Sequence, residues 1–195
     1  IHLRDLQAQL GPDLWTLQET TALTVGAAYR VDNLRLASGA QRMRLDGLVA
    51  PTGTQHLDAS LSGVRLGGIT PLLGLGDLAG TVTAEAQLRG DATAPTLDSD
   101  LRLRLQSEGR EVGTLRLSAG YDDLHARLDG QFTHTTGRTL TINGAVPTDL
   151  RLQASAPVDL ADAPVRLNAT TDRFPIDWID PFFDPATVRS VRGML

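Results

Sequence analysis

The chain has 195 residues, a formal net charge of −5 and a pI near 5.3. It is long enough to bury a core, and its acidic balance argues against a nucleic-acid-binding surface. It contains no cysteine, which excludes disulfides, thiolate metal sites and a cysteine nucleophile. No apolar run approaches the roughly 20 residues that a membrane-spanning helix needs. The chain starts in mid-pattern at Ile1, so we expect it to be a piece of a longer polypeptide.

The first third of the chain predicts strands. Residues 1–10 fit either a short helix or a strand, because three leucines have helical spacing but Gly11 and Pro12 end the segment early. From residue 15 to residue 61, apolar residues recur at every second position, which is typical of strands with one apolar and one solvated face. The phase of this alternation slips at Asn33, which predicts a β-bulge there.

Two segments interrupt the alternation. Residues 64–76 hold clustered apolar side chains, and Pro71 suits the start of a short helix. Residues 174–183 place apolar side chains at helical spacing with aspartates on the other side, which predicts a short amphipathic helix. Because the two segments resemble each other, we predict repeat units of about 64–173 and 174 onward within one continuous unit, 1–195.

The most regular alternation runs from residue 80 to residue 132. Leucine, valine and alanine occupy one phase of each strand, and arginine and aspartate occupy the other. Glu108-Gly109 and Asp122-Asp123 suit tight turns, so the segment predicts a meander of antiparallel strands. Further alternating stretches follow at 140–142, 150–154 and 165–169.

These patterns predict an all-β protein but leave its layers open. A β-sandwich core and a single sheet with one apolar face share the same period of two. Judged on periodicity alone, the sandwich is the favoured arrangement.

No motif predicts catalysis, a cofactor or a metal site. The histidines are scattered, and the aspartate pairs suit turns better than a Ca²⁺ loop. Gly74, Gly76 and Ala79 loosely fit a dinucleotide fingerprint, but a strand pattern follows where that motif needs a helix. We expect no enzyme activity. The arginines at 102, 104, 116 and 127 are interpreted as a solvated outer face, with contacts to phosphate groups at a groove rim as the alternative.

A series of short motifs, in order and spacing, resembles the β-rich C-terminal half of the TamB/AsmA-like family, the translocation and assembly module subunits. The motifs are Trp15-Thr-Leu17, Val31-Asp-Asn-Leu34-Arg-Leu36, Met43-Arg-Leu-Asp-Gly47, Ile69-Thr-Pro-Leu-Leu73, Leu78-Ala-Gly80-Thr-Val82, Leu88-Arg-Gly90-Asp, Pro95-Thr-Leu97, Val146-Pro147 before Leu150, and Gly193-Met-Leu195. They cover most of the chain.

The resemblance implies an elongated, curved antiparallel sheet, a taco-like groove with an apolar inner face and one or two short helical inserts. It also implies a function: carrying phospholipid along the groove between the inner and outer bacterial membranes. The parent protein would be anchored in the inner membrane, cross the periplasm and partner an Omp85-type outer-membrane barrel, while this segment would be soluble. The alternative is a structural or interaction module of the cell envelope, or of outer-membrane protein assembly, that uses its sheet edges.

On this reading a set of apolar residues lines the groove collectively and contacts acyl chains. We expect this lining at Leu61, Val82, Leu101, Leu103, Leu105, Leu115, Leu117, Ala126, Leu128 and Phe132.

Overall fold

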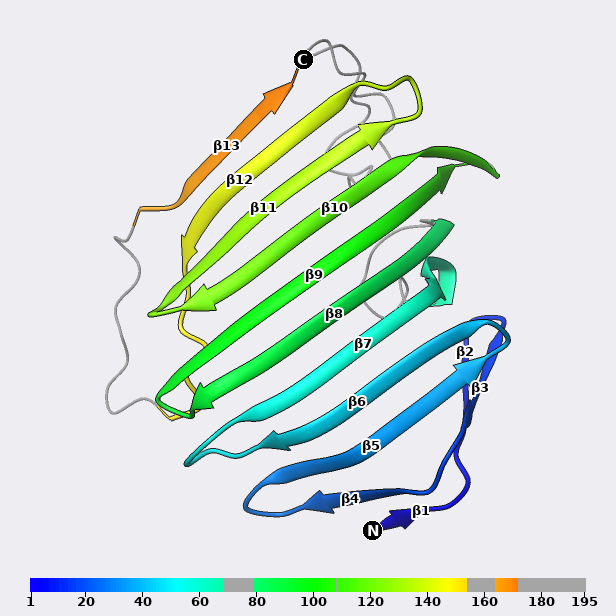
Figure 1. The fold of residues 1–195 in the computed structure, drawn as a ribbon, viewed down its shortest axis with the longest axis vertical. Helices are drawn as coiled ribbons and strands as arrows, with labels where there is room; N and C mark the ends of the chain where they lie inside the picture. The colour runs from blue at the N-terminus through cyan, green and yellow to red at the C-terminus, as the bar shows by residue number, and fades with distance from the viewer. Residues whose placement is uncertain (69–78, 108, 154–163, 172–195) are drawn as a thin grey trace, which may run out of the picture.

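The computed structural model describes residues 1–68, 79–107, 109–153 and 164–171. They form one antiparallel sheet of 13 strands, which is twisted and arched (Figure 1). The all-β, curved-sheet prediction is confirmed. The strands are β1 (His2–Leu3), β2 (Gln7–Leu10), β3 (Asp13–Leu17), β4 (Thr21–Val25), β5 (Tyr29–Ser38), β6 (Gln41–Val49), β7 (His56–Arg65), β8 (Ala79–Asp91), β9 (Ala94–Ser107), β10 (Arg110–Asp122), β11 (His125–His134), β12 (Thr139–Pro147) and β13 (Arg166–Thr171).

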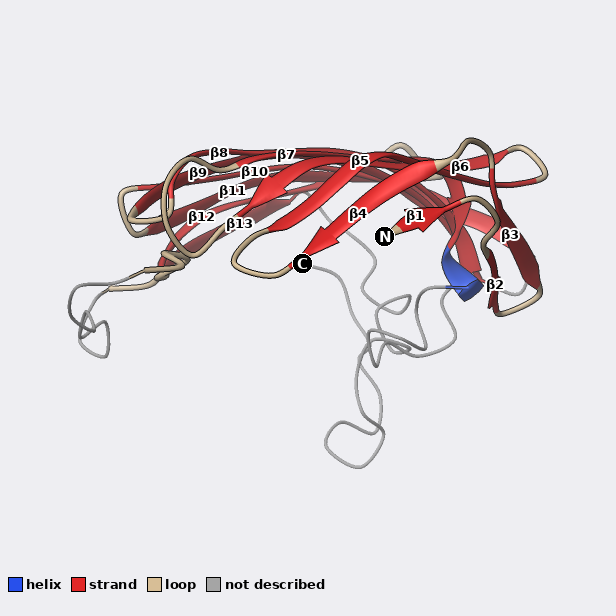
Figure 2. Ribbon diagram, turned by 90° about the horizontal axis from the view of Figure 1, so that it is seen from below, coloured by secondary structure: helices blue, strands red, loops and turns tan. Residues whose placement is uncertain are grey.

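The strand order follows the chain from β4 to β13, with β1 beside β4. The β2–β3 hairpin leaves this path. Because β6 pairs along one edge of β5, β4 and β3 share the other edge, and β3 pairs there only through Thr16 and Leu17. Figure 2 shows the hairpin turned down from the arch, beside the short 3₁₀ turn η1 (Leu66–Gly68).

Three β-bulges bend the sheet. The predicted bulge at Asn33 is confirmed: Val31 pairs with Gly47, Leu34 pairs with Leu45, and Asn33 has a φ of +54°. Similar one-residue shifts occur in β7 before Val64 and in β10 before Gly113. A bulge increases the local twist and bends its strand, so these three positions account for part of the curvature.

The β10–β11 hairpin turns one residue later than predicted. Its central residues are Asp123 and Leu124, with φ of +44° and +61°. Two successive positive φ values are typical of a type I′ turn, whose twist matches that of the flanking strands. Leu124, which continues the apolar phase in sequence, therefore belongs to the turn, and β11 starts at His125.

The structure tests the predictions for residues 1–10 and for part of the first insert. Residues 1–10 form strands rather than a helix. The first break in alternation starts later than expected, because β7 continues to Arg65; Leu66–Gly68 then forms a 3₁₀ turn. The rest of that insert, residues 69–78, and the insert at 174–183 lie outside the described residues, as does the predicted second repeat unit.

The predicted strand at 150–154 is wrong for the residues described there. The chain instead crosses the ends of other strands: the Leu150 N–H donates to the Tyr121 hydroxyl and the Leu152 N–H to the Ala92 carbonyl. Its backbone groups therefore find partners without a neighbouring strand.

Candidate functional site

Pairing between strands aligns the apolar residues on one side of the sheet, here called the apolar face. One ladder runs across six strands through Val64, Val82, Leu103, Leu115, Phe132 and Leu140. A second runs from β5 to β10 through Leu36, Met43, Leu61, Ala84, Leu101 and Leu117. The ladders lie across the strands, so the apolar face is continuous along the long axis of the arch.

All ten residues predicted to line a groove lie on this face. Val82, Leu105 and Phe132 are buried. The remaining seven are half-buried: Leu61, Leu101, Leu103, Leu115, Leu117, Ala126 and Leu128. Their role as a lining stays a prediction.

Next to the second ladder, on the side away from the first, runs a row of small side chains, here called the small-residue row. It passes from β7 to β12 through Ala59, Ala86, Ser99, Ala119 and Gly144, with Leu128 as its one long side chain. At about 4.8 Å between strands, the row is about 24 Å long. The lining predicted from the sequence includes Leu128 but none of the small residues, although each shares the phase of its apolar neighbours along the strand.

One end of the apolar face, here called the hairpin end, is covered by the β2–β3 hairpin and η1. Trp15 of β3 is 1% exposed and packs with Val64 and Leu66. The adjacent Asp13 carboxylate is also buried and accepts two hydrogen bonds from the Arg65 guanidinium, the one from Nε at 3.0 Å. A buried carboxylate needs such a partner, because desolvation of an unpaired charge is costly.

The opposite end is crossed by residues 148–153, here called the strap. The N–H of Thr148 donates to the Leu124 carbonyl at 2.8 Å, and the N–H of Leu150 donates to the Tyr121 hydroxyl at 3.1 Å. Tyr121 belongs to the apolar face and is 4% exposed.

The strap also carries an ion pair. Asp149 accepts two hydrogen bonds from the Arg151 side chain, at 2.8 and 2.9 Å, and another from the Arg151 backbone N–H at 3.0 Å. These bonds favour the carboxylate and lower the pKa of Asp149 to about 2.

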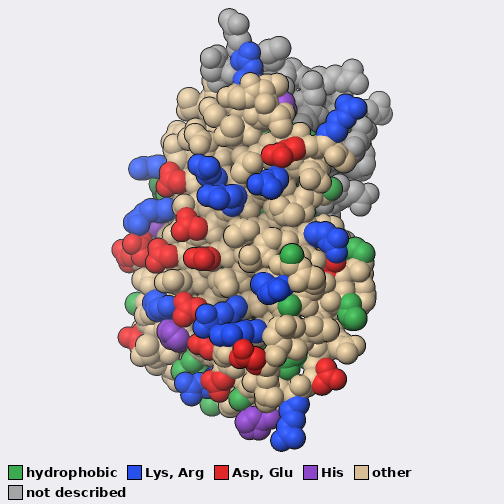
Figure 3. Space-filling model, turned by 45° about the vertical axis from the view of Figure 1, so that its right-hand side comes forward, with side chains coloured by type: hydrophobic (Ala, Val, Ile, Leu, Met, Phe, Trp, Pro, Cys, Tyr) green, Lys and Arg blue, Asp and Glu red, His purple; other side chains and the backbone are tan. Residues whose placement is uncertain are grey.

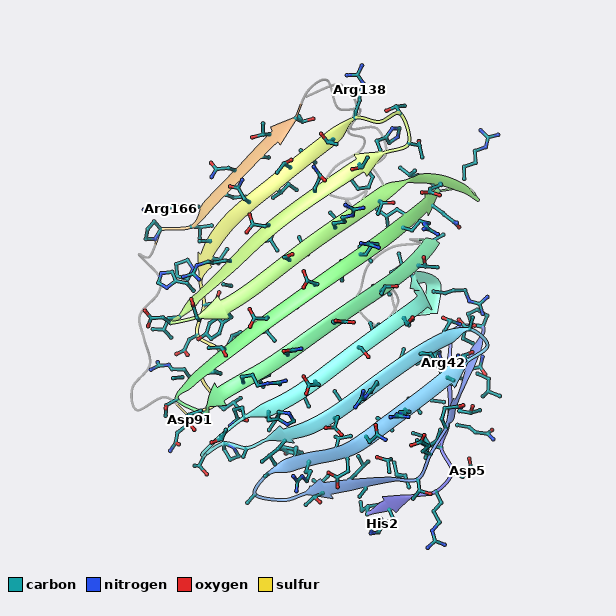
Figure 4. All side chains as sticks on the ribbon, viewed as in Figure 1. His2, Asp5, Arg42, Asp91, Arg138 and Arg166 are labelled. Carbon is teal, nitrogen blue, oxygen red and sulfur yellow. The ribbon has the colours of Figure 1, made fainter. Side chains whose placement is uncertain are left out.

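The other side of the sheet, here called the polar face, carries the charged side chains. Acidic and basic groups are interspersed over it, and few apolar side chains reach its surface (Figure 3). Figure 4 places Asp91, Arg138 and Arg166 at the rim of the sheet. Arg89 pairs with Asp58 at 2.6 Å and lowers the pKa of that carboxyl through its hydrogen bond.

Within the described residues, no three acidic, histidine or cysteine side chains come together as metal ligands. The same residues contain no helix that is long and apolar enough to cross a membrane.

Comparison with family models, curated proteins and solved structures finds no match to this chain. The TamB/AsmA-like assignment therefore stays a prediction from the sequence motifs.

Proposed function

We propose that the apolar face binds phospholipid acyl chains and that the chain is a lipid-conducting segment of a larger TamB/AsmA-like envelope protein. The observation that carries this proposal is the continuity of the apolar ladders across the strands. In the described part of the chain there is no second sheet against this face, and the hairpin and the strap cover its two ends. This distinguishes it from the core of a β-sandwich, where a facing sheet covers the ladders.

The shape of the face suits an extended hydrocarbon. The covered ends lie at the ends of the strands, so a ligand on this face extends across the strands, along the small-residue row. Transfer of a chain of about sixteen carbons out of water contributes up to about 12 kcal/mol, at about 0.8 kcal/mol per methylene. The apolar face covers only one side of the acyl chain, so binding provides only part of this transfer free energy. The bound lipid can therefore still move along the face.

The small-residue row also lacks polar groups that would hold a passing chain. Ser99 is its one polar side chain, and its hydroxyl already donates to the Ala119 carbonyl at 3.2 Å. The Tyr121 hydroxyl, at the edge of the face, is engaged by the strap. A hydrocarbon tail therefore meets no unsatisfied side-chain donor or acceptor along this row.

The proposal is tested by substituting aspartate for leucine on the apolar face. We expect Leu117→Asp and Leu103→Asp to abolish lipid transfer between donor and acceptor liposomes, because each places a carboxylate on the apolar face that the acyl chain contacts. Leu117→Ala and Leu103→Ala should retain most transfer, since the lining acts collectively. Thr133→Asp, an exposed position on the polar face of β11, is the matched charge control.

Circular dichroism and thermal unfolding establish that each variant is folded. Native mass spectrometry then reports phospholipid bound to the purified chain. Folded Asp variants that still bind and transfer lipid at the unmodified rate would show that the apolar face is not the lipid path.

A second function, an interaction module that uses the sheet edges, is supported by the exposed side chains there. Val165 and Leu167 at β13 are each 65% exposed, and Val25 of β4 at the other edge is 67% exposed. Edge strands with apolar side chains recruit further strands. Lipid-free oligomers in native mass spectrometry would favour this function, whereas monomers with bound phospholipid would favour the lipid path.

A further inference from the structure

The polar face contains a shallow hollow over the middle of β8, β9 and β10. Its volume is about 440 Å³. The polar side chains that line it are Thr83, Glu85, Asp100, Arg102, Arg116 and Ser118. It lies on the opposite side of the sheet from the apolar ladders.

The charges at this hollow form two like-charge pairs. Glu85 lies directly opposite Asp100, and Arg102 lies directly opposite Arg116. Like charges in directly opposed positions of a sheet destabilise it. The carboxylate pair and the guanidinium pair are offset by two residues along the strands, which is about 6.8 Å.

These charges are not neutralised by ion pairs within the described part of the chain. Neither arginine, nor Glu85, makes an ion pair or a side-chain hydrogen bond to another described residue, and Asp100 accepts one hydrogen bond, from the Ser118 hydroxyl at 2.7 Å. Arg127, on the same face one strand away, instead pairs with Asp122 at 3.0 Å. Four arginines were interpreted as a solvated outer face. Of these, Arg127 is paired, and Arg102 and Arg116 lie opposite each other at the hollow.

We propose that this hollow binds a small zwitterion: a phosphate ester that carries a primary amine. The two guanidiniums hold the phosphate, and the carboxylates of Glu85 and Asp100 hold the ammonium. A phosphate fits better than a carboxylate, because its three terminal oxygens can accept a bidentate pair of hydrogen bonds from each guanidinium, whereas one guanidinium fork already engages both oxygens of a carboxylate. Ligand binding thereby compensates both like-charge pairs at once.

The proposal is independent of lipid conduction on the apolar face, and the two are tested by different variants. The shared chemistry, an amine two carbons from a phosphate, occurs in free phosphoethanolamine and in an ethanolamine phospholipid headgroup. Because the hollow is open and shallow, we expect an affinity of about 1 mM, typical of a site with a few exposed charge contacts.

The test is a titration of the isotope-labelled 195-residue chain with phosphoethanolamine, followed by amide chemical shifts. We expect shifts to concentrate at Thr83–Glu85, Asp100–Arg102 and Arg116–Ser118. Inorganic phosphate and ethanolamine should each bind at least about tenfold more weakly, because each satisfies one pair only. Co-sedimentation with phosphatidylethanolamine vesicles, against phosphatidylcholine vesicles, then distinguishes a lipid headgroup from a free compound as the source.

Matched variants assign the two halves of the site. Arg116→Gln should weaken phosphoethanolamine binding about tenfold or more, whereas Arg127→Gln, at the paired arginine, should leave it unchanged. Glu85→Gln should weaken phosphoethanolamine binding but strengthen binding of inorganic phosphate. The proposal is overturned if phosphate binds as tightly as phosphoethanolamine, if Arg116→Gln has no effect, or if no shifts occur up to about 50 mM ligand, well above the expected affinity.

Discussion

The two ends of the apolar face are covered in different ways. At the hairpin end, a tryptophan and a carboxylate are both buried, and the residues that meet are far apart in sequence, with Asp13 and Arg65 separated by 52 positions. At the strap end, the ion pair joins Asp149 to its near neighbour Arg151, and both side chains retain contact with solvent. The hairpin end is therefore tied to the tertiary fold, whereas the ion pair of the strap is a local contact.

The two ion pairs have similar geometry but contribute different amounts to the free energy of unfolding. A hydrogen-bonded ion pair with a buried partner costs much to break, since a charge is then left without water or a counter-charge. A partly exposed pair such as Asp149–Arg151 costs less, since water replaces part of the lost interaction. Variants at Trp15, Arg65 and Arg151 should therefore lower the free energy of unfolding by successively smaller amounts.

The largest effect is expected at Trp15. Trp15→Ala removes the largest fully buried side chain at the hairpin end and should lower the free energy of unfolding by about 3–5 kcal/mol. Urea denaturation measures the loss. Trp15→Phe is the control, because it keeps an aromatic side chain against Val64 and Leu66 and should cost clearly less. Equal losses for the two variants would mean that packing at Trp15 does not hold the hairpin.

An intermediate effect is expected at the buried ion pair. Arg65→Gln leaves the Asp13 carboxylate buried without its cation and should lower the free energy of unfolding by about 2 kcal/mol. Adding Asp13→Asn to Arg65→Gln should recover part of this loss, because no uncompensated charge then remains. If the double variant is less stable than Arg65→Gln by the full cost of Asp13→Asn alone, the two side chains are not coupled.

The smallest effect is expected at the strap. Arg151→Gln should lower the urea midpoint less than Arg65→Gln does, because its partner Asp149 is a near neighbour in sequence that keeps some contact with solvent when the cation is removed. It should nevertheless raise the pKa of Asp149 from about 2 toward the ordinary value of 3.8, which a carboxyl-carbon NMR titration measures. Since the folded-state pKa is lowered, the contribution of Asp149 is complete above about pH 3.8 and is lost as the pH falls toward 2. An Asp149 pKa that stays near 2 in Arg151→Gln would exclude Arg151 as its cause.

Much of the local structure was predictable from alternation. The strands from β9 to β11 follow directly from the phase of Leu101, Leu117 and Leu128, and the slip at Asn33 predicted a bulge. The strap was not predictable, since Leu150 and Leu152 alternate as a strand would. Their backbone groups bond instead to Tyr121 and Ala92, which are 29 or more positions away in the sequence.

The two candidate sites were likewise predictable only in part. The sequence placed the leucines on an apolar side and the arginines on a polar side. It gave no indication that Ala59, Ala86, Ser99 and Ala119 form one row, nor that Arg102 faces Arg116 while Arg127 pairs with Asp122.

By itself, the sequence determined the strands and which side of each strand is apolar, because successive side chains of a strand point to opposite faces. The tertiary structure decided the register between strands, and with it the ladders, the small-residue row and the hollow with two like-charge pairs. It also decided that the hairpin and the strap cover the two ends. Register and end contacts depend on pairings between distant residues, and a period of two is the same in every register.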